Sequence, residues 1–433
     1  MVNNINQLLV QAQIAHDAAD WSLLIQYLQQ LILKQDSTNP EIVKNREQML
    51  ELALSILEFG DFQQRWEIAK VFLQLGNIAI PRLIEILEDE DAEEEVRWYA
   101  ARILSEFKHP DTIAPLVQLL KSSDSQELKA MAATALGEMD TLAIAALSEL
   151  LSDDDTRLLA VRSLSYIRRT EVIAPLLSVI QDPQAAVRAA AIAALSSFHD
   201  QRIPPLLIKA LDDFATPVRL AAVQGLGFRS DLCETLDLVT QLQPRLYDLN
   251  EDVACAAAIA LARMGGDNAA KYLFEVLFLP NQSIKLQLET IRSLSWLGTS
   301  SSLEYLQQAL NQSLSETLWQ EIVTVLGRVQ QPELTAIATE ILLKMLRLKH
   351  PATEIANIKS AIALSLGQLG QIQAIESLIL LLADPNKSVR LHAIAALKNL
   401  APEVAYQRLQ QLAQNTTITS ELQKGIAFAL TEW

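Results

Sequence analysis

A short pattern recurs along most of the chain and restricts its fold more than any other feature. An apolar residue precedes a basic one, small and apolar residues follow, and leucine stands seven positions after the basic residue. The best copies are VRAAAIAAL (187–195), VRLAAVQGLG (218–227) and VRLHAIAALKNL (389–400). Alanine and leucine favour helix, and this spacing places the leucines on one face. Each copy therefore predicts one amphipathic helix.

The basic position of each copy, called the anchor below, recurs with a period near 32 residues. A period of this length is typical of a helix pair and too short for a propeller blade. We therefore predict an all-α fold, a right-handed α-α superhelix of about 11–12 stacked helical hairpins. The anchors, several of them degenerate, are Arg65, Arg97, Lys129, Arg157, Arg188, Arg219, Ala254, Gln287, Trp319, Lys359, Arg390 and Gln423.

Each anchor helix is preceded by a second apolar segment. Three of these segments, 79–87, 113–120 and 173–180, carry proline near their start, where its missing N–H costs no hydrogen bond. An acid then stands about six residues before several anchors, and Asp182-Pro183 and Asp384-Pro385 predict N-caps of the anchor helices. Recurring acids and arginines also suggest an ionic ladder along the turns. The alternative is that the arginines only solvate one face.

Two regions depart from the period. Residues 1–60 lack it and predict an N-terminal helical cap, with helices at 4–18, 21–34 and 41–59 and a loop at 37–40; the solenoid then spans 61–433. Anchors 319 and 359 are 40 residues apart, which predicts an irregular unit near 320–358 with longer helices or an insertion.

Composition excludes several functions. The net charge of −17, with no basic stripe, argues against binding nucleic acid or anionic membranes. No apolar run is long enough to span a bilayer and no secretory signal is apparent, so we expect a cytoplasmic protein. The two cysteines form no CxxC pair, and the five histidines are scattered, so we predict no metal and no cofactor. Motifs of conventional catalytic sites are also missing.

The anchor alignment predicts a binding face. Positions +1, +5 and +8 or +9 from an anchor share one side of its helix, and in stacked hairpins these second helices line the inner side. Aromatic and basic residues recur there, and these types dominate binding hot spots. The alternative is that the aromatic rings pack between repeats and the arginines pair with acids. The candidate residues are Trp66, Lys70, Trp98, Arg102, Arg162, Tyr166, Arg292 and Trp296.

Another candidate contact is the run Glu88–Glu95, in which only Ala92 is not acidic. It lies between two predicted helices, where it is either a solvated turn or a contact for a basic partner. Cys255 also occupies a +1 position, and we interpret it as a small buried residue rather than as a nucleophile.

The DPxxxVRxxAxxAL pattern at 182–195 and 384–397 resembles the HEAT-like repeats of the phycobilin lyase family, best known from cyanobacteria and red algae. The resemblance covers roughly residues 60–433. It implies a photosynthetic setting, in which members attach linear tetrapyrroles to client cysteines, detach them, or assist assembly. The family provides no catalytic motif that could be transferred to this chain.

Three functions remain open. The first is a protein–protein interaction scaffold or assembly factor, whose partners the resemblance implies to be phycobiliprotein subunits or another pigment–protein complex. The second is a phycobilin lyase or isomerase, for which a bilin would be the bound substrate. The third and least favoured is nucleic-acid binding, which the acidic charge opposes.

Overall fold

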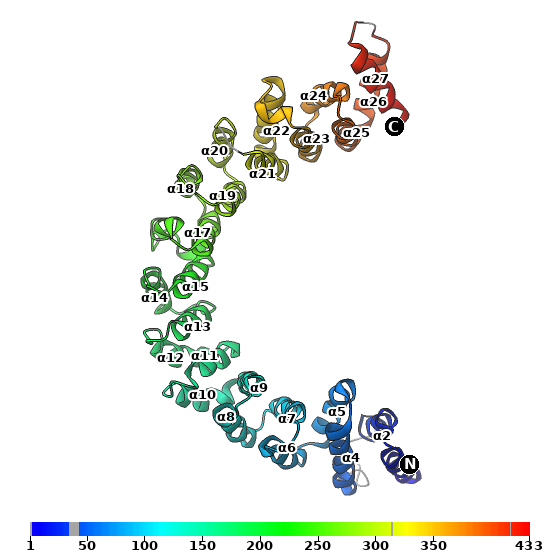
Figure 1. The fold of residues 1–433 in the computed structure, drawn as a ribbon, viewed down its shortest axis with the longest axis vertical. Coiled ribbons are helices and arrows are strands. Elements are labelled where there is room, and N and C mark those ends of the chain that lie inside the picture. Colours follow the sequence, from blue (N-terminus) through cyan, green and yellow to red (C-terminus); the bar gives the residue numbers. More distant parts are fainter. Residues whose placement is uncertain (1, 34–42, 313–314, 416) are drawn as a thin grey trace. The chain divides into compact units, whose positions relative to one another are not determined.

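The computed structural model describes residues 2–33, 43–312, 315–415 and 417–433. Within these residues every regular element is a helix, so the all-α prediction is confirmed. The chain divides into two compact units, Met1–Ile203 and Pro204–Trp433. In each unit, helical hairpins follow one another along the sequence (Figure 1). Every anchor lies in or directly beside the second helix of one hairpin, which confirms the repeat.

The first unit contains five hairpins within the described residues, preceded by the helix pair α1 (Val2–Asp17) and α2 (Trp21–Leu33). Short 3-10 turns precede three of the first helices: η1 (Pro110–Thr112), η2 (Asp140–Ala143) and η3 (Thr170–Val172). The first helices are α4 (Arg46–Phe59), α6 (Ala79–Glu88), α8 (Ile113–Ser122), α10 (Ile144–Leu150) and α12 (Ile173–Ser178), and the second helices are α5 (Phe62–Leu75), α7 (Glu94–Phe107), α9 (Gln126–Glu138), α11 (Arg157–Tyr166) and α13 (Ala185–Leu195).

The second unit contains seven hairpins in its described residues. The first helices are α14 (Ile203–Ala210), α16 (Leu238–Leu242), α18 (Asp267–Leu277), α20 (Ser300–Leu310), α22 (Pro332–Arg347), α24 (Ile375–Leu380) and α26 (Pro402–Ala413). The second helices are α15 (Thr216–Gly227), α17 (Glu251–Met264), α19 (Ile284–Leu297), α21 (Glu316–Gly327), α23 (Ala356–Leu369), α25 (Lys387–Leu400) and α27 (Ser420–Thr431). The 3-10 turns are η4 (Ser230–Leu232), η5 (Gln243–Tyr247), η6 (Pro351–Glu354), η7 (Ile372–Ala374) and η8 (Leu381–Ala383).

Small residues allow neighbouring second helices to pack closely. In the first unit α5, α7, α9, α11 and α13 pack in succession, and in the second unit α15 to α25 do the same. Position +8 of one hairpin meets position +6 of the next. A Cβ on Gly137 would lie 2.9 Å from the Ser163 carbonyl oxygen, and one on Gly367 would lie 2.8 Å from Ala396 Cα. Larger side chains at these positions would push the helices apart.

An ionic ladder connects successive hairpins, as the recurring acids suggested. Arg157 pairs with Asp182 at 2.9 Å in the first unit, and Lys359 pairs with Asp384 at 2.7 Å in the second. Each acid belongs to the hairpin after the one that carries the cation. Anchor arginines also donate to carbonyl oxygens at the end of their own first helix, as Arg157 Nε does to Leu151 at 2.6 Å. The anchor cations therefore make hydrogen bonds within their own hairpin and ion pairs to the next hairpin.

The predicted N-cap role of Asp182 and Asp384 is wrong. The N-caps of α13 and α25 are Gln184 and Asn386, two residues later. Each aspartate instead accepts the backbone N–H of that N-cap residue, at 2.8 and 2.9 Å. In this position each carboxylate meets the cation of the preceding hairpin, Arg157 for Asp182 and Lys359 for Asp384.

The predicted boundary at residue 60 falls between α4 and α5, which pack against each other as one hairpin. The cap over 1–60 therefore stays a prediction, and its loop at 37–40 lies outside the described residues. In the irregular region near 320–358, α22 has 16 residues and η6 follows it. Just before η6, His350 Nε2 contacts the Leu310 carbonyl oxygen at 2.8 Å. Leu310 ends the first helix α20, where other hairpins use an anchor arginine to contact such a carbonyl oxygen.

Candidate functional site

Four aromatic side chains gather on α5 and α7 in the first unit, and we call Phe62, Trp66, Trp98 and Tyr99 the aromatic platform. Phe62 lies 6.5 Å from Trp66 and 6.0 Å from Tyr99 between ring centroids, and Trp98 lies 5.1 Å from Tyr99. Tyr99 is buried and donates its hydroxyl to the Phe62 carbonyl oxygen at 3.1 Å. Phe62 and Trp66 are 62% and 42% exposed, so the platform presents aromatic surface to solvent.

Arg102 on α7 lies across the platform. Its guanidinium carbon is 3.5 Å from the centroid of Trp66, and one terminal nitrogen lies 3.4 Å from Glu106. The other terminal nitrogen is buried, and no hydrogen-bond partner for it exists in the part of the chain that the structure describes. A cation held over tryptophan gains about 0.5–2 kcal/mol. The structure thus joins two sequence-predicted residues, Trp66 and Arg102, in one contact.

The other predicted residues of the first unit take different places. Trp98 joins the platform through Tyr99 and is half-buried, while Lys70 is exposed on α5. Arg162 and Tyr166 are exposed one turn apart on α11. Among the described residues, no hydrogen bond, ion pair or ring contact links these last two to the platform.

In the second unit, Arg292 and Trp296 of α19 line a small cleft against α17, called the α17–α19 cleft below. Its volume is about 180 Å³. Arg292 is held by Glu321 at 2.7 Å and by Glu289 at 3.7 Å, whereas Trp296 is 73% exposed. The lining residues are Ile259, Ala262, Arg263, Glu289, Arg292, Ser293 and Trp296.

Sequence reasoning missed three exposed residues of these two sites. Arg263 and Phe228 both occupy position +9, and the guanidinium carbon of Arg263 lies 4.4 Å from the Phe228 centroid. The alignment therefore contained the signal for both. Phe62 stands three residues before its anchor, outside the positions that were compared, so only the packing of α5 against α7 reveals it.

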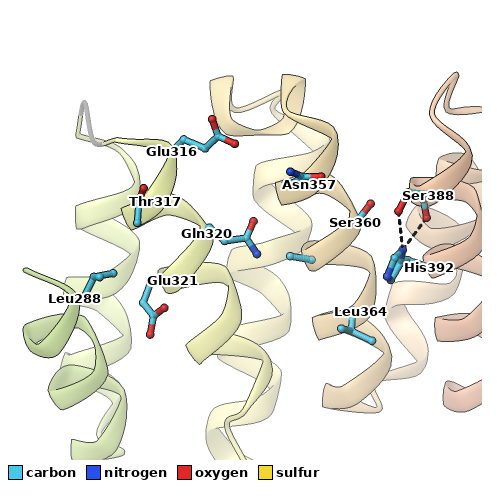
Figure 2. Close-up of a pocket in the computed structure, with 11 residues that line it drawn as sticks. Leu288, Glu316, Thr317, Gln320, Glu321, Asn357, Ser360, Leu364, Ser388 and His392 are labelled. Atoms are coloured by element: carbon cyan, nitrogen blue, oxygen red, sulfur yellow. Dashed lines mark hydrogen bonds between the residues drawn. The ribbon is translucent and has the colours of Figure 1, made fainter. Parts of the chain in front are cut away.

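A larger groove of about 620 Å³ crosses α19, α21, α23 and α25 (Figure 2). Leu288 and Leu364 supply apolar surface, and the side-chain amides of Gln320 and Asn357 lie on successive second helices. His392 Nδ1 contacts the Ser388 carbonyl oxygen at 2.7 Å, which fixes this ring against its own helix. Positions +1 and +5 contribute Leu288, Gln320, Ser360 and Leu364, so the aligned positions do share a face here.

Most of the acidic run Glu88–Glu95 lies in the turn between α6 and α7, and part of it belongs to the ladder. Arg65 pairs with Glu95 at 2.6 Å and with Glu93 at 3.2 Å, and Ser125 donates a hydrogen bond to Glu94. Other acids of the run, among them Asp89 and Asp91, line a hollow of about 480 Å³. The run is therefore both a structural turn and an acidic surface.

The two thiols are poorly suited to nucleophilic attack. Burial raises the pKa of the Cys255 thiol to about 11, and it also raises the pKa of Cys233. Attack requires the thiolate, which is scarce in both cases at neutral pH.

Within the described ranges, no group of three or more histidine, cysteine or acidic residues could hold a metal ion. No helix among those residues is long and apolar enough to cross a membrane.

Comparisons with known proteins place the fold. The family described as HEAT repeats matches residues 80–160, 144–227 and 339–431. Kap95p, from a study of its binding to RanGDP, is 14% identical with a TM-score of 0.54, and the alignment covers 100% of this chain and 66% of that one. Kap121p bound to RanGTP is 14% identical with a TM-score of 0.58, covering 90% and 48%. At such identity the likeness shows the fold alone, and the chain spans about half to two thirds of these karyopherins. No curated protein matches the sequence.

Proposed function

We propose that this chain, which belongs to the HEAT-repeat family, is a docking scaffold that binds a protein client on the exposed face of its second helices. The observation that carries this proposal is the aromatic platform. Aromatic residues make up only 5% of the chain, yet four meet on α5 and α7 with Arg102 stacked on one of them. Tryptophan, tyrosine and arginine are the residues that contribute most binding energy at protein interfaces.

The charge around the platform indicates the kind of client surface. Glu94 and Glu95 stand at the start of α7, on the helix that carries Trp98 and Arg102. The acidic turn before it adds further negative charge. A client surface with basic residues around an apolar centre would complement this arrangement and associate faster.

We further propose that the client is a phycobiliprotein or another photosynthetic pigment–protein assembly in the cytoplasm. The support for this identity is the resemblance of the repeats at 182–195 and 384–397 to those of the phycobilin lyase family. The docking function does not depend on the client being of this class.

A second candidate function is a phycobilin lyase or isomerase. The stacking of Arg102 on Trp66 favours it, since a bilin offers a flat conjugated system to the ring and propionates to guanidinium groups. The acceptor thiol would belong to the client, because both thiols of this chain have raised pKa values. Incubation of the purified chain with a bilin and a client tests it: unchanged absorbance and no covalent chromophore on the client would refute it.

The docking function is tested by affinity capture from the native host, with mass spectrometry of the bound proteins. Trp66→Ala should weaken capture of the client by about 30-fold or more, the effect expected of an interface hot spot. Trp98→Ala should do the same with a larger loss of stability, because Trp98 is half-buried. Phe214→Ala, which removes an exposed ring from a turn of the second unit, is the matched control. Equal capture by all variants would disprove the role of the platform.

A further inference from the structure

The α17–α19 cleft has the size of a single side chain and combines apolar walls with cationic and hydroxyl groups. Ile259, Ala262 and Trp296 form its apolar surface, and Arg263 and Ser293 supply hydrogen-bond donors. Glu289 and Arg292 complete the lining, and their side chains pair with each other. The cleft lies wholly within the second unit. A ligand group that enters it would contact aliphatic and aromatic surface along its stem and donors at its tip.

Arg263 differs from most arginines of this chain, because it forms no ion pair with any described residue. Its neighbour Arg292 is neutralised by Glu321 and Glu289, and the ladder arginine Arg219 pairs with Asp248. Arg263 is held instead over the Phe228 ring, 4.4 Å from its centroid, in an exposed position. Stacking fixes the plane of the guanidinium and leaves its edge N–H groups for a ligand.

The hydroxyl of Ser293 is a second donor without a partner. Serines at the equivalent position +6 donate to backbone carbonyls, Ser163 to Leu159 at 2.9 Å and Ser365 to Val323 at 3.1 Å. Ser293 is 3% exposed, lines the cleft and has no hydrogen-bond partner among the described residues. Buried polar groups are rarely left unpaired, so this hydroxyl is free to donate to a water molecule or to a ligand group in the cleft.

Both donors select an acceptor with negative charge and a planar shape. A carboxylate satisfies both, since it accepts from a guanidinium edge and from a hydroxyl at the same time. A nucleic acid would bring many linked phosphates against a chain with net charge −17, whereas a single carboxylate brings one charge beside Arg263. A glutamate or aspartate side chain, with its aliphatic stem, also matches the apolar walls.

The groove of Figure 2 extends the cleft along the neighbouring helices. The ion pair of Arg292 with Glu321 is the shared wall, because Arg292 lines the cleft and Glu321 lines the groove. Further along, the amides of Gln320 and Asn357 lie on successive helices, and Leu364 lies below Asn357 and Ser360 on α23 (Figure 2). A side-chain amide both donates and accepts, as a peptide group does. The groove thus suits an extended backbone.

We propose that this face of the second unit binds an extended polypeptide segment of a partner, whose aspartate or glutamate side chain enters the α17–α19 cleft. The segment's backbone follows the groove across α21 and α23. This site is additional to the docking of a folded client on α5 and α7, and it does not depend on that client's identity.

Fluorescence anisotropy with the full chain tests the proposal. The probe is a short fluorescein-labelled peptide with one central glutamate between two leucines, compared with the same peptide carrying glutamine. The glutamate peptide should bind about tenfold more tightly, and Arg263→Ala should abolish this preference. Arg263→Glu should reverse it toward a lysine peptide. Arg347→Ala is the matched control, because Arg347 is an exposed arginine of the same unit on a first helix.

Ser293→Ala gives an independent reading. It should weaken binding of the glutamate peptide several-fold and leave the glutamine peptide and the melting temperature unchanged. Equal binding of the two peptides, or an equal loss with Arg347→Ala, would overturn the proposal. The Trp66→Ala variant tests the docking function on the first unit separately. If Trp66→Ala weakened client capture while the glutamate and glutamine peptides bound equally, this inference would be refuted and the docking function would stand.

Discussion

Replacing Asp248 by asparagine tests the ionic ladder at a step where the carboxylate is buried and contacted by two nitrogens. Arg219 on α15 donates hydrogen bonds from two nitrogens to Asp248 of the next hairpin, at 2.7 and 2.8 Å. The Asp248 side chain is only 3% exposed, and one of its oxygens also accepts the Asn250 backbone N–H at 2.9 Å. Asparagine has the same size, so the substitution removes charge and one acceptor without opening a cavity.

We expect Asp248→Asn to lower the free energy of unfolding by about 2–3 kcal/mol. A hydrogen bond to a charged group contributes about 1.5–3 kcal/mol, and removing one partner of a buried ion pair typically costs about 3–5 kcal/mol. The amide oxygen of asparagine still accepts one hydrogen bond, so we expect a loss below the ~3–5 kcal/mol typical of a broken buried ion pair. Because hairpins are stabilised by their neighbours, the loss should spread through α15 and α17.

The pH dependence of stability should change with the same substitution. Burial alone would raise the pKa of the Asp248 carboxyl, but hydrogen bonds from Arg219 and from the Asn250 backbone hold it below the ordinary value of 3.8. A lowered folded-state pKa stabilises the fold above pH 3.8, and this contribution is lost as the pH falls through the lowered value. The variant should lack this step in acid.

Urea unfolding and hydrogen exchange of α15 and α17 measure both effects. The matched control is Asp140→Asn in the first unit, where Arg169 makes a similar two-nitrogen contact that is far more exposed. Exposed pairs contribute little, so the control should change stability much less. If Asp140→Asn and Asp248→Asn had equal effects, burial would not set the strength of the ladder, and the reasoning would fail.

Three further predictions concern packing, reactivity and the irregular hairpin. Gly367→Ala should cost about 1–3 kcal/mol in urea unfolding, because its Cβ would lie 2.8 Å from Ala396 Cα; unchanged stability would show that α23 and α25 are not closely packed. Cys255 should react slowly with iodoacetamide at pH 8 and faster as the pH approaches its pKa of about 11, and rapid labelling at pH 8, followed by mass spectrometry, would contradict its burial. His350→Ala should destabilise the second unit by about 1–3 kcal/mol, because the Leu310 carbonyl loses its partner, and a variant as stable as the native chain would show that the contact is dispensable.

The sequence could predict the features that repeat. The anchor spacing located the second helices, and the acid–arginine recurrence indicated the ladder, because both depend on contacts that every hairpin makes. Residues at positions +1 and +5 line the groove of Figure 2 together. The candidate binding residues stay predictions, although Trp66 and Arg102 do meet across two helices.

Features set by individual tertiary contacts were beyond sequence reasoning. The anchors mark second helices only, so the period does not show whether residues 46–59 pack against α5 or only against the helices before them. Asp182 resembles an N-cap by its place before proline, but the cation of the preceding hairpin decides its role. The Ser293 hydroxyl is unpartnered among the described residues because no acceptor lies near it in the folded chain, and the local sequence does not show this.

Hydroxyl-radical footprinting of the chain, free and bound to a captured client, tests most directly whether the exposed face of the second helices is the docking surface. We expect Phe62, Trp66 and Trp98 to lose reactivity in the complex, while Phe214 and Tyr247, exposed in turns of the second unit, keep theirs. Protection of those two turn residues with an unchanged platform would contradict the account.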